Sequence, residues 1–103
     1  MTASAAAKAT YSVIDAYDHP HGGRILRLRL GRGEALGVKE LQSGALAATS
    51  PEGEEARIEV LGFALFGGRV SDARLARTGR VDIRVRGEDA RGVRPGWTVA
   101  GPA

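Results

Sequence analysis

One short stretch constrains the fold more than any other: Leu26, Leu28 and Leu30 alternate with Arg27 and Arg29. Successive side chains of a β-strand point to opposite faces, so a strand here buries the leucines and exposes the arginines. A helix would scatter the same arginines around its circumference. We therefore predict a half-buried strand that carries arginine on its outer face.

The stretch Arg80–Arg86 repeats the pattern, with Val81, Ile83 and Val85 predicted to point inward. Its outward side chains are then three arginines and Asp82. A turn of helix is predicted within Val70–Thr78. The remaining β-patterned runs are Tyr11–Tyr17, Leu36–Leu41, Ala45–Thr49, Ala56–Phe66 and Trp97–Ala100.

Turn residues separate these runs, and they include 15 glycines spread along the chain. Val93–Gly96 has Pro and Gly where a type II turn requires them. About six or seven short strands divided by such turns are typical of an all-β sandwich or barrel. The other predicted turns are His19–Gly23, Gly31–Gly33, Gln42–Gly44, Ser50–Gly53 and Gly67–Gly68.

Two runs indicate how their strands are placed. In the first run, Tyr11, Val13 and Asp15 are expected on one face. The run Ala56–Phe66 is apolar on both faces, which predicts a central strand or one that bends at Gly62. Its two faces are Ile58, Val60, Gly62 and Ala64 on one side and Leu61, Phe63 and Leu65 on the other.

The length of 103 residues fits one domain. We expect a flexible tail over residues 1–10 and a single β-barrel domain over residues 11–103. No run approaches the about 20 apolar residues of a membrane-spanning helix, so no membrane partner is expected. Cysteine is absent, which excludes disulfides and fits a cytoplasmic location.

Charge is unevenly distributed. Between residues 24 and 33 four arginines and no acids give +4, whereas six acids against two bases give −4 over residues 34–60. The basic residues comprise 13 arginines and two lysines, and arginine suits bidentate contacts with phosphate. Two interpretations stay open: a binding surface for an acidic partner, or a solvated face in the arginine-rich product of a GC-rich genome.

Several segments together resemble the β-barrel domain two of elongation factor Tu and its relatives. That family has an apolar strand with a central glycine, a strand that ends in Arg-Gly, and a closing strand after a basic–Gly turn. The likeness covers about residues 11–102. The segments that carry it are Gly23–Gly33, Leu41–Leu46, Val60–Phe66, Thr78–Gly87 and Arg91–Ala100.

The resemblance implies a closed six-stranded Greek-key barrel. The family's contacts to the aminoacylated end of tRNA fall at Ala64, Gly67 and Gly68, which carry no charge, although the family's Arg before Gly is kept as Arg86. That particular task is therefore not implied. No Walker A pattern occurs, so no nucleotide is expected as ligand.

No catalytic constellation is visible, so we expect a protein that is not an enzyme and needs no cofactor. His19 and His21, close to Asp15 and Asp18, fit either a metal site or a solvated turn, and the turn is favoured. No serine has the context of a nucleophile elbow. The carboxylates Glu52, Glu54, Glu55 and Glu59 have no nucleophile near them and predict a solubilising loop.

The arginines are the strongest functional feature. If their strands lie close, Arg27, Arg29, Arg84 and Arg86 form one outward face that binds RNA phosphates or a ribosome-associated protein. Phe63 and Trp97, two of only five aromatic residues, are expected in the core, which disfavours reading of bases.

Two alternatives stay open. Cross-strand pairing with Asp82, Glu40 or Glu59 would account for the same arginines without a ligand. The chain could instead be a protein–protein or homo-oligomerisation module, whose contact surface would be Leu61, Phe63 and Leu65 if they emerge on the outer face.

Overall fold

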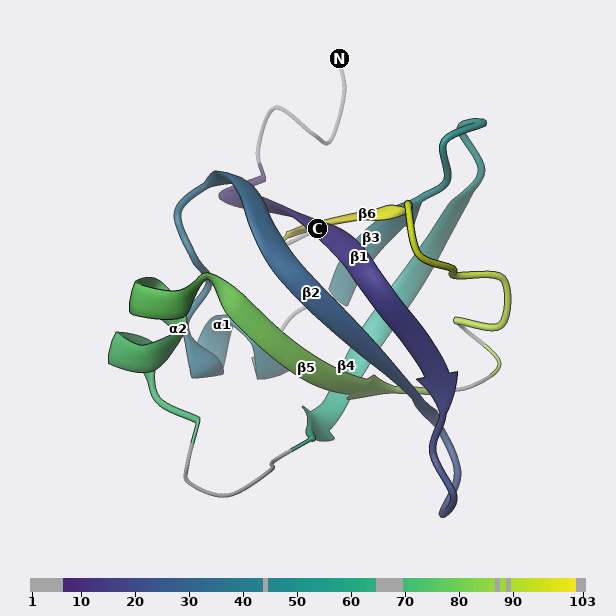
Figure 1. Cartoon of the computed structure of the whole chain (residues 1–103), viewed down its shortest axis with the longest axis horizontal. Helices are drawn as coiled ribbons and strands as arrows, with labels where there is room; N and C mark the ends of the chain where they lie inside the picture. The colour runs from purple at the N-terminus through teal and green to yellow at the C-terminus, as the bar shows by residue number, and fades with distance from the viewer. Residues whose placement is uncertain (1–6, 44, 65–69, 87, 89, 102–103) are drawn as a thin grey trace.

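A computed structural model describes residues 7–43, 45–64, 70–86, 88 and 90–101. Its six strands are all antiparallel to their neighbours and form a closed ring in the order β1–β2–β5–β4–β3–β6 (Figure 1). The predicted all-β class is thus confirmed. In chain order the elements are β1 Ala9–Asp18, β2 Arg24–Gly33, α1 Val38–Ser43, β3 Ala45–Thr49, β4 Glu55–Phe63, α2 Asp72–Thr78, β5 Arg80–Val85 and β6 Thr98–Gly101.

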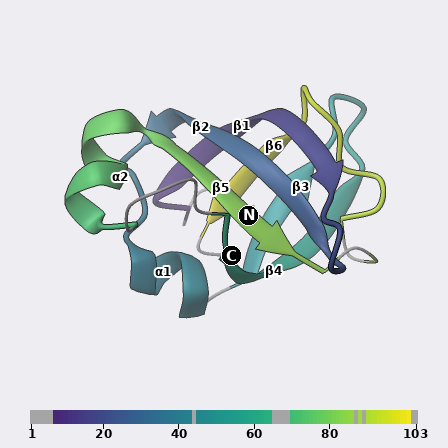
Figure 2. The same cartoon turned by 60° about the horizontal axis from the view of Figure 1, so that its bottom comes forward.

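The alternation on β2 and β5 fills the interior as predicted. Leu26 pairs with Ile83 and Leu28 with Val81 across the ladder, and all four side chains are buried. Phe63 and Trp97 pack against this core while partly buried. Both helices lie at the end of the barrel opposite the β1–β2 hairpin (Figure 2).

Of the three register shifts in the described ladders, two overturn the predicted inward faces. On β1 the register shifts between Val13 and Asp15, so Val13 is buried while Asp15 lies opposite Arg27 on the outer face. The expectation that Asp15 shares a face with Tyr11 and Val13 was therefore wrong. A bulge leaves one residue unpaired and rotates the side chains that follow it. The residue that absorbs this shift, Ile14, is 40% exposed.

The second bulge lies on β4, between Val60 and Gly62. Val60 is buried and Phe63 packs against the core, whereas Gly62 pairs with Arg84 on the outer face. The predicted division into two alternating faces therefore fails at Leu61. The remaining members of that prediction are Ala64, which follows the strand, and Leu65, which is outside the described residues.

The strand predicted over Leu36–Leu41 is wrong, because helix α1 begins at Val38. The first turn of a helix has N–H groups without intrahelical partners, and here carboxylates accept them. Asp72 Oδ1 accepts from the Val38 N–H at 2.8 Å, and Glu40 Oε1 accepts from the Gly37 N–H at 3.0 Å. The first of these carboxylates comes from helix α2, 34 residues along the chain.

The helical turn predicted within Val70–Thr78 is confirmed as α2, Asp72–Thr78. Ser71 is its N-cap and accepts from the Arg74 N–H at 3.2 Å, while Gly79 ends it with a left-handed φ of 65°. Of this helix only Leu75 is buried.

The barrel extends two residues beyond the predicted start, because Ala9 pairs with both Gly33 and Gly101. The type II turn predicted over Val93–Gly96 lies one residue later, over Arg94–Trp97: the Trp97 N–H donates to the Arg94 carbonyl at 3.1 Å, and Gly96 has a φ of 99°. Among the described residues, neither helix is long and apolar enough to cross a membrane.

Candidate nucleic-acid interface on the outer face of β1, β2 and β5

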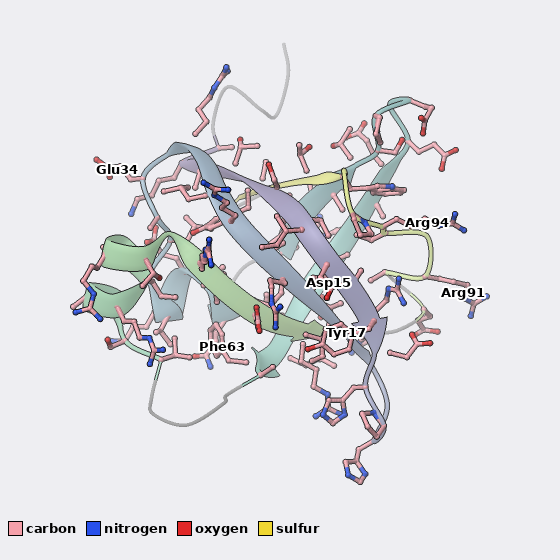
Figure 3. All side chains as sticks on the ribbon, viewed as in Figure 1. Asp15, Tyr17, Glu34, Phe63, Arg91 and Arg94 are labelled. Atoms are coloured by element: carbon pink, nitrogen blue, oxygen red, sulfur yellow. The ribbon has the colours of Figure 1, made fainter. Side chains whose placement is uncertain are left out.

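Strand register arranges the outward side chains of β1, β2 and β5 into three rows across the sheet. Directly opposite residues on one face lie about 4.5–5.5 Å apart at Cβ, so each row brings its side chains together. Figure 3 shows two of the members, Asp15 and Tyr17, following one another along β1 toward the hairpin. We name them the arginine row (Ser12, Arg29, Arg80), the ion-pair row (Asp15, Arg27, Asp82) and the hairpin row (Tyr17, Ile25, Arg84).

In the ion-pair row, Asp82 neutralises Arg27. The Arg27 Nε and Nη2 atoms donate to the two carboxylate oxygens of Asp82 at 3.2 and 3.4 Å. This hydrogen bonding to Asp82 raises the pKa of Arg27 above its ordinary value. A second carboxylate, Asp15, lies opposite Arg27 on its other side. The cross-strand pairing therefore accounts for Arg27 without an external ligand.

In the hairpin row, Arg84 supports the turn between β1 and β2. Its Nε and Nη2 donate to the Gly22 carbonyl at 3.2 and 3.0 Å, and Nη2 also donates to the His21 carbonyl at 3.4 Å. The residue after Gly22 must also be glycine, because a Cβ on Gly23 would lie 2.8 Å from the Val85 carbonyl oxygen. The Nε and Nη2 donors of Arg84, which could bind a phosphate in bidentate fashion, are thus used by the protein's own backbone.

The arginine row has no such compensation. Arg29 on β2 lies directly opposite Arg80 on β5, and both side chains are exposed. Within the described part of the chain, neither guanidinium forms an ion pair. Two positive charges therefore face each other across the ladder, and no described acidic residue pairs with either of them.

More positive charge lies beside this row. Arg32 follows on β2 opposite Thr10 and is exposed. The Leu30 N–H donates to the Gly79 carbonyl at 2.6 Å, which ties β2 to the end of helix α2. That helix carries the exposed side chains of Arg74 and Arg77.

The structure thus brings together part of the predicted site. β2 and β5 are adjacent, as the prediction required, and Arg27, Arg29 and Arg84 share the outer face. Arg86 is exposed just beyond the end of β5. Of the four predicted residues, only Arg29 and Arg86 have no partner among the described residues. The residue missed was Arg80, whose outward direction the alternation indicates but whose neighbour only the register reveals.

The rival acidic partners behave differently from one another. Asp82 pairs with an arginine as anticipated, but Glu40 pairs with Lys8 at 2.9 Å. Glu59 on β4 lies opposite Ala45 on β3 and is exposed. The other glutamates of the predicted solubilising loop, Glu52, Glu54 and Glu55, are exposed as well.

The two histidines lie in the hairpin turn with ring centroids 5.6 Å apart. His19 Nδ1 accepts from the His21 N–H at 3.0 Å, so that nitrogen is occupied. In the part of the chain that the structure describes, no three His, Cys, Asp or Glu residues are grouped to hold a metal ion. Arg91 and Arg94 extend outward from the loop before β6 (Figure 3).

The apolar surface considered for a protein partner is small. Leu61 is 51% exposed, but Phe63 packs against the core, and Leu65 lies outside the described residues. Single exposed apolar side chains are ordinary on protein surfaces.

Comparison with known proteins adds no family. The chain matches no protein-family model, no curated protein and no solved structure. The resemblance to domain two of elongation factor Tu therefore rests on the sequence motifs that carry it.

Proposed function

We propose that this chain is a non-enzymatic RNA-binding barrel, similar to translation-factor domain two, which contacts phosphates through its arginine row. The observation that carries the proposal is the unbalanced pair Arg29 and Arg80 on neighbouring strands. Like charges directly opposite each other destabilise a sheet. An anion bound between them would remove that repulsion.

Phosphate is the anion that best fits this arrangement. Guanidinium groups form charge-assisted, bidentate hydrogen bonds with phosphate oxygens, and two of them side by side suit a backbone that repeats its charge. The released counterions would supply affinity that does not depend on sequence. Arg32 and the arginines of α2 would extend the contact beyond one phosphate.

The domain-two resemblance directs the proposal toward RNA of the translation apparatus, or toward a ribosome-associated surface that displays such RNA. Greek-key topology and a cytoplasmic location belong to the same proposal. The uncharged Ala64 keeps it separate from recognition of an aminoacylated tRNA end.

Fluorescence anisotropy with a short labelled RNA, measured across a series of salt concentrations, tests the proposal. We expect binding at low salt, and the logarithm of the binding constant should fall linearly with the logarithm of the salt concentration. The double variant Arg29→Ala/Arg80→Ala should lose roughly tenfold in affinity, and its salt slope should fall by about 0.7 for each lost contact with a single strand.

Arg57→Ala is the matched control, since Arg57 is also an exposed strand arginine but lies on β4 between Glu55 and Glu59. Its affinity should equal that of the unmodified protein. The proposal fails if the unmodified protein does not bind at low salt, or if Arg57→Ala weakens binding as much as the double variant does.

A further inference from the structure

The hairpin row contains an apolar residue that the interior does not explain. Ile25 points to the outer face of β2, yet it is only 1% exposed and does not belong to the core cluster. Its neighbours in the row are Tyr17 and Arg84, so these two side chains cover it from either side. The outer face thus has a buried apolar side chain between Tyr17 and Arg84, beside the ion-pair row.

Two planar groups lie on either side of this buried isoleucine in the row. Tyr17 is half-buried, and no hydrogen bond involves its hydroxyl among the described residues. The guanidinium of Arg84 is held by the Gly22 and His21 carbonyls, which consume its Nε and Nη2 donors. A guanidinium fixed in this way is poorly placed to bind phosphate through its donors, whereas guanidinium groups also stack through their flat faces.

The described residues leave room on the β4 side of Arg84. Gly62 is its cross-strand neighbour on β4, and a Cβ at Gly62 would meet no atom of the described residues within 4 Å. None of these residues therefore blocks a flat ligand group that approaches the row next to Gly62.

We infer that the hairpin row is a stacking platform for a nucleobase, and that the chain consequently prefers single-stranded RNA to duplex. This inference rests on the proposed function. Bases of a single strand can be splayed onto aromatic rings and guanidinium planes, whereas bases within a duplex are already stacked on each other. Residue 25 lies four strand residues from Arg29, roughly 13 Å away, so one oligonucleotide can reach both rows.

The experiment compares three RNA probes of equal length: a single strand, its duplex, and an abasic strand that keeps the phosphates but lacks the bases. The unmodified protein should bind the single strand about 5- to 150-fold more tightly than the abasic strand, the range for one stacked base. Tyr17→Phe keeps the ring and should preserve this ratio. Tyr17→Leu should lower it toward unity without changing affinity for the abasic strand.

A second measurement needs no variant. A strand carrying one fluorescent 2-aminopurine between abasic positions should lose fluorescence when the unmodified protein binds it, because stacking quenches this base. Unchanged fluorescence on binding overturns the inference.

The outcomes separate the two claims. If none of the three probes binds, the proposed function itself fails. If the single strand and the abasic strand bind equally, or if Tyr17→Leu weakens both to the same extent, RNA binding stands and the stacking platform does not.

Discussion

Arg29 and Arg80 face each other across the β2–β5 ladder, and no acidic residue in the described part of the chain compensates them. Repulsion between opposed like charges costs roughly 0.2–1 kcal/mol. Arg80→Glu should therefore raise the free energy of unfolding by a similar amount at low salt while it weakens RNA binding. Chemical denaturation at low and high salt measures this, and the gain should shrink as salt screens the pair. A variant less stable than the parent at low salt would contradict the prediction.

Arg24 ties the base of the hairpin to the loop before β6. Its Nη2 donates to the Val93 carbonyl and its Nη1 to Asp18, each at 3.0 Å. Arg24→Ala leaves a part-buried carbonyl without its donor and should cost about 1–3 kcal/mol in unfolding free energy. Asp18→Ala should cost at most about 1 kcal/mol, because the Asp18 side chain is 86% exposed. Urea titration measures the unfolding free energy of both variants. Equal losses of unfolding free energy would refute the prediction that Arg24→Ala is the more destabilising.

Gly33 cannot carry a side chain without strain. Its φ is 85°, and a Cβ there would collide with the Lys8 carbonyl oxygen and lie 3.0 Å from Ala9 Cα. We expect Gly33→Ala to lower the unfolding free energy by more than about 2 kcal/mol.

Gly53→Ala is the matched control for this prediction. Gly53 also has a positive φ, of 96°, but no atom of the described residues lies within 4 Å of its Cβ position. The control should show the backbone strain alone, about 1 kcal/mol. Thermal melts that rank the two variants equally would show that the close approach at Gly33 does not matter.

Glu40 should make the barrel sensitive to acid. The Gly37 N–H, and secondarily Lys8, hold the pKa of Glu40 below its ordinary value of 4.5. A carboxylate with a depressed folded-state pKa stabilises the fold above its unfolded pKa, and this stabilisation is lost as the pH falls through the folded value. Melting temperatures of Glu40→Gln should therefore fall less between about pH 6 and about pH 3 than those of the parent.

Lys8→Met is the companion variant for this pH series. It leaves the hydrogen bond from the Gly37 N–H in place, and that bond is the larger cause of the shift. Most of the acid sensitivity should therefore remain. If Lys8→Met abolishes the pH dependence as fully as Glu40→Gln does, the surface ion pair is responsible instead.

Tyr11 connects the segment before α1 to β1. Its buried hydroxyl accepts from the Leu36 N–H at 2.9 Å, and burial raises the pKa of this hydroxyl. Tyr11→Phe leaves the buried Leu36 N–H without an acceptor and should lower the unfolding free energy by about 1–3 kcal/mol. The Tyr17 hydroxyl has no partner among the described residues, so Tyr17→Phe should leave the unfolding free energy nearly unchanged.

The strands that local pattern determines could be predicted. On β5, and between Leu26 and Leu30 of β2, the inward residues are apolar and the outward residues are charged, so alternation alone separates the two faces there. Helix α2 was predictable for a similar reason, since good helix formers lie within it and its cap is local.

Other features depend on contacts distant in the sequence. The bulge on β1 turns Asp15 to the outer face opposite Arg27, whereas simple alternation after Tyr11 and Val13 places it inward. Helix α1 depends on Asp72, which no window around Val38 contains. The candidate site follows the same division: local pattern directs Arg29 outward, but only the pairing of two strands about fifty residues apart places Arg80 beside it.

The short strand β6 has a consequence for the order of folding. Its four residues pair with β1 on one side and with β3 on the other, so they join strands made much earlier. While the chain is being synthesised, the edges of β1 and β3 that pair with β6 stay unpaired until residue 101 has left the ribosome. Contacts of such long sequence separation form slowly. The nascent barrel therefore passes through an interval in which it is open and prone to pair with other chains, and this interval ends only when its last strand is made.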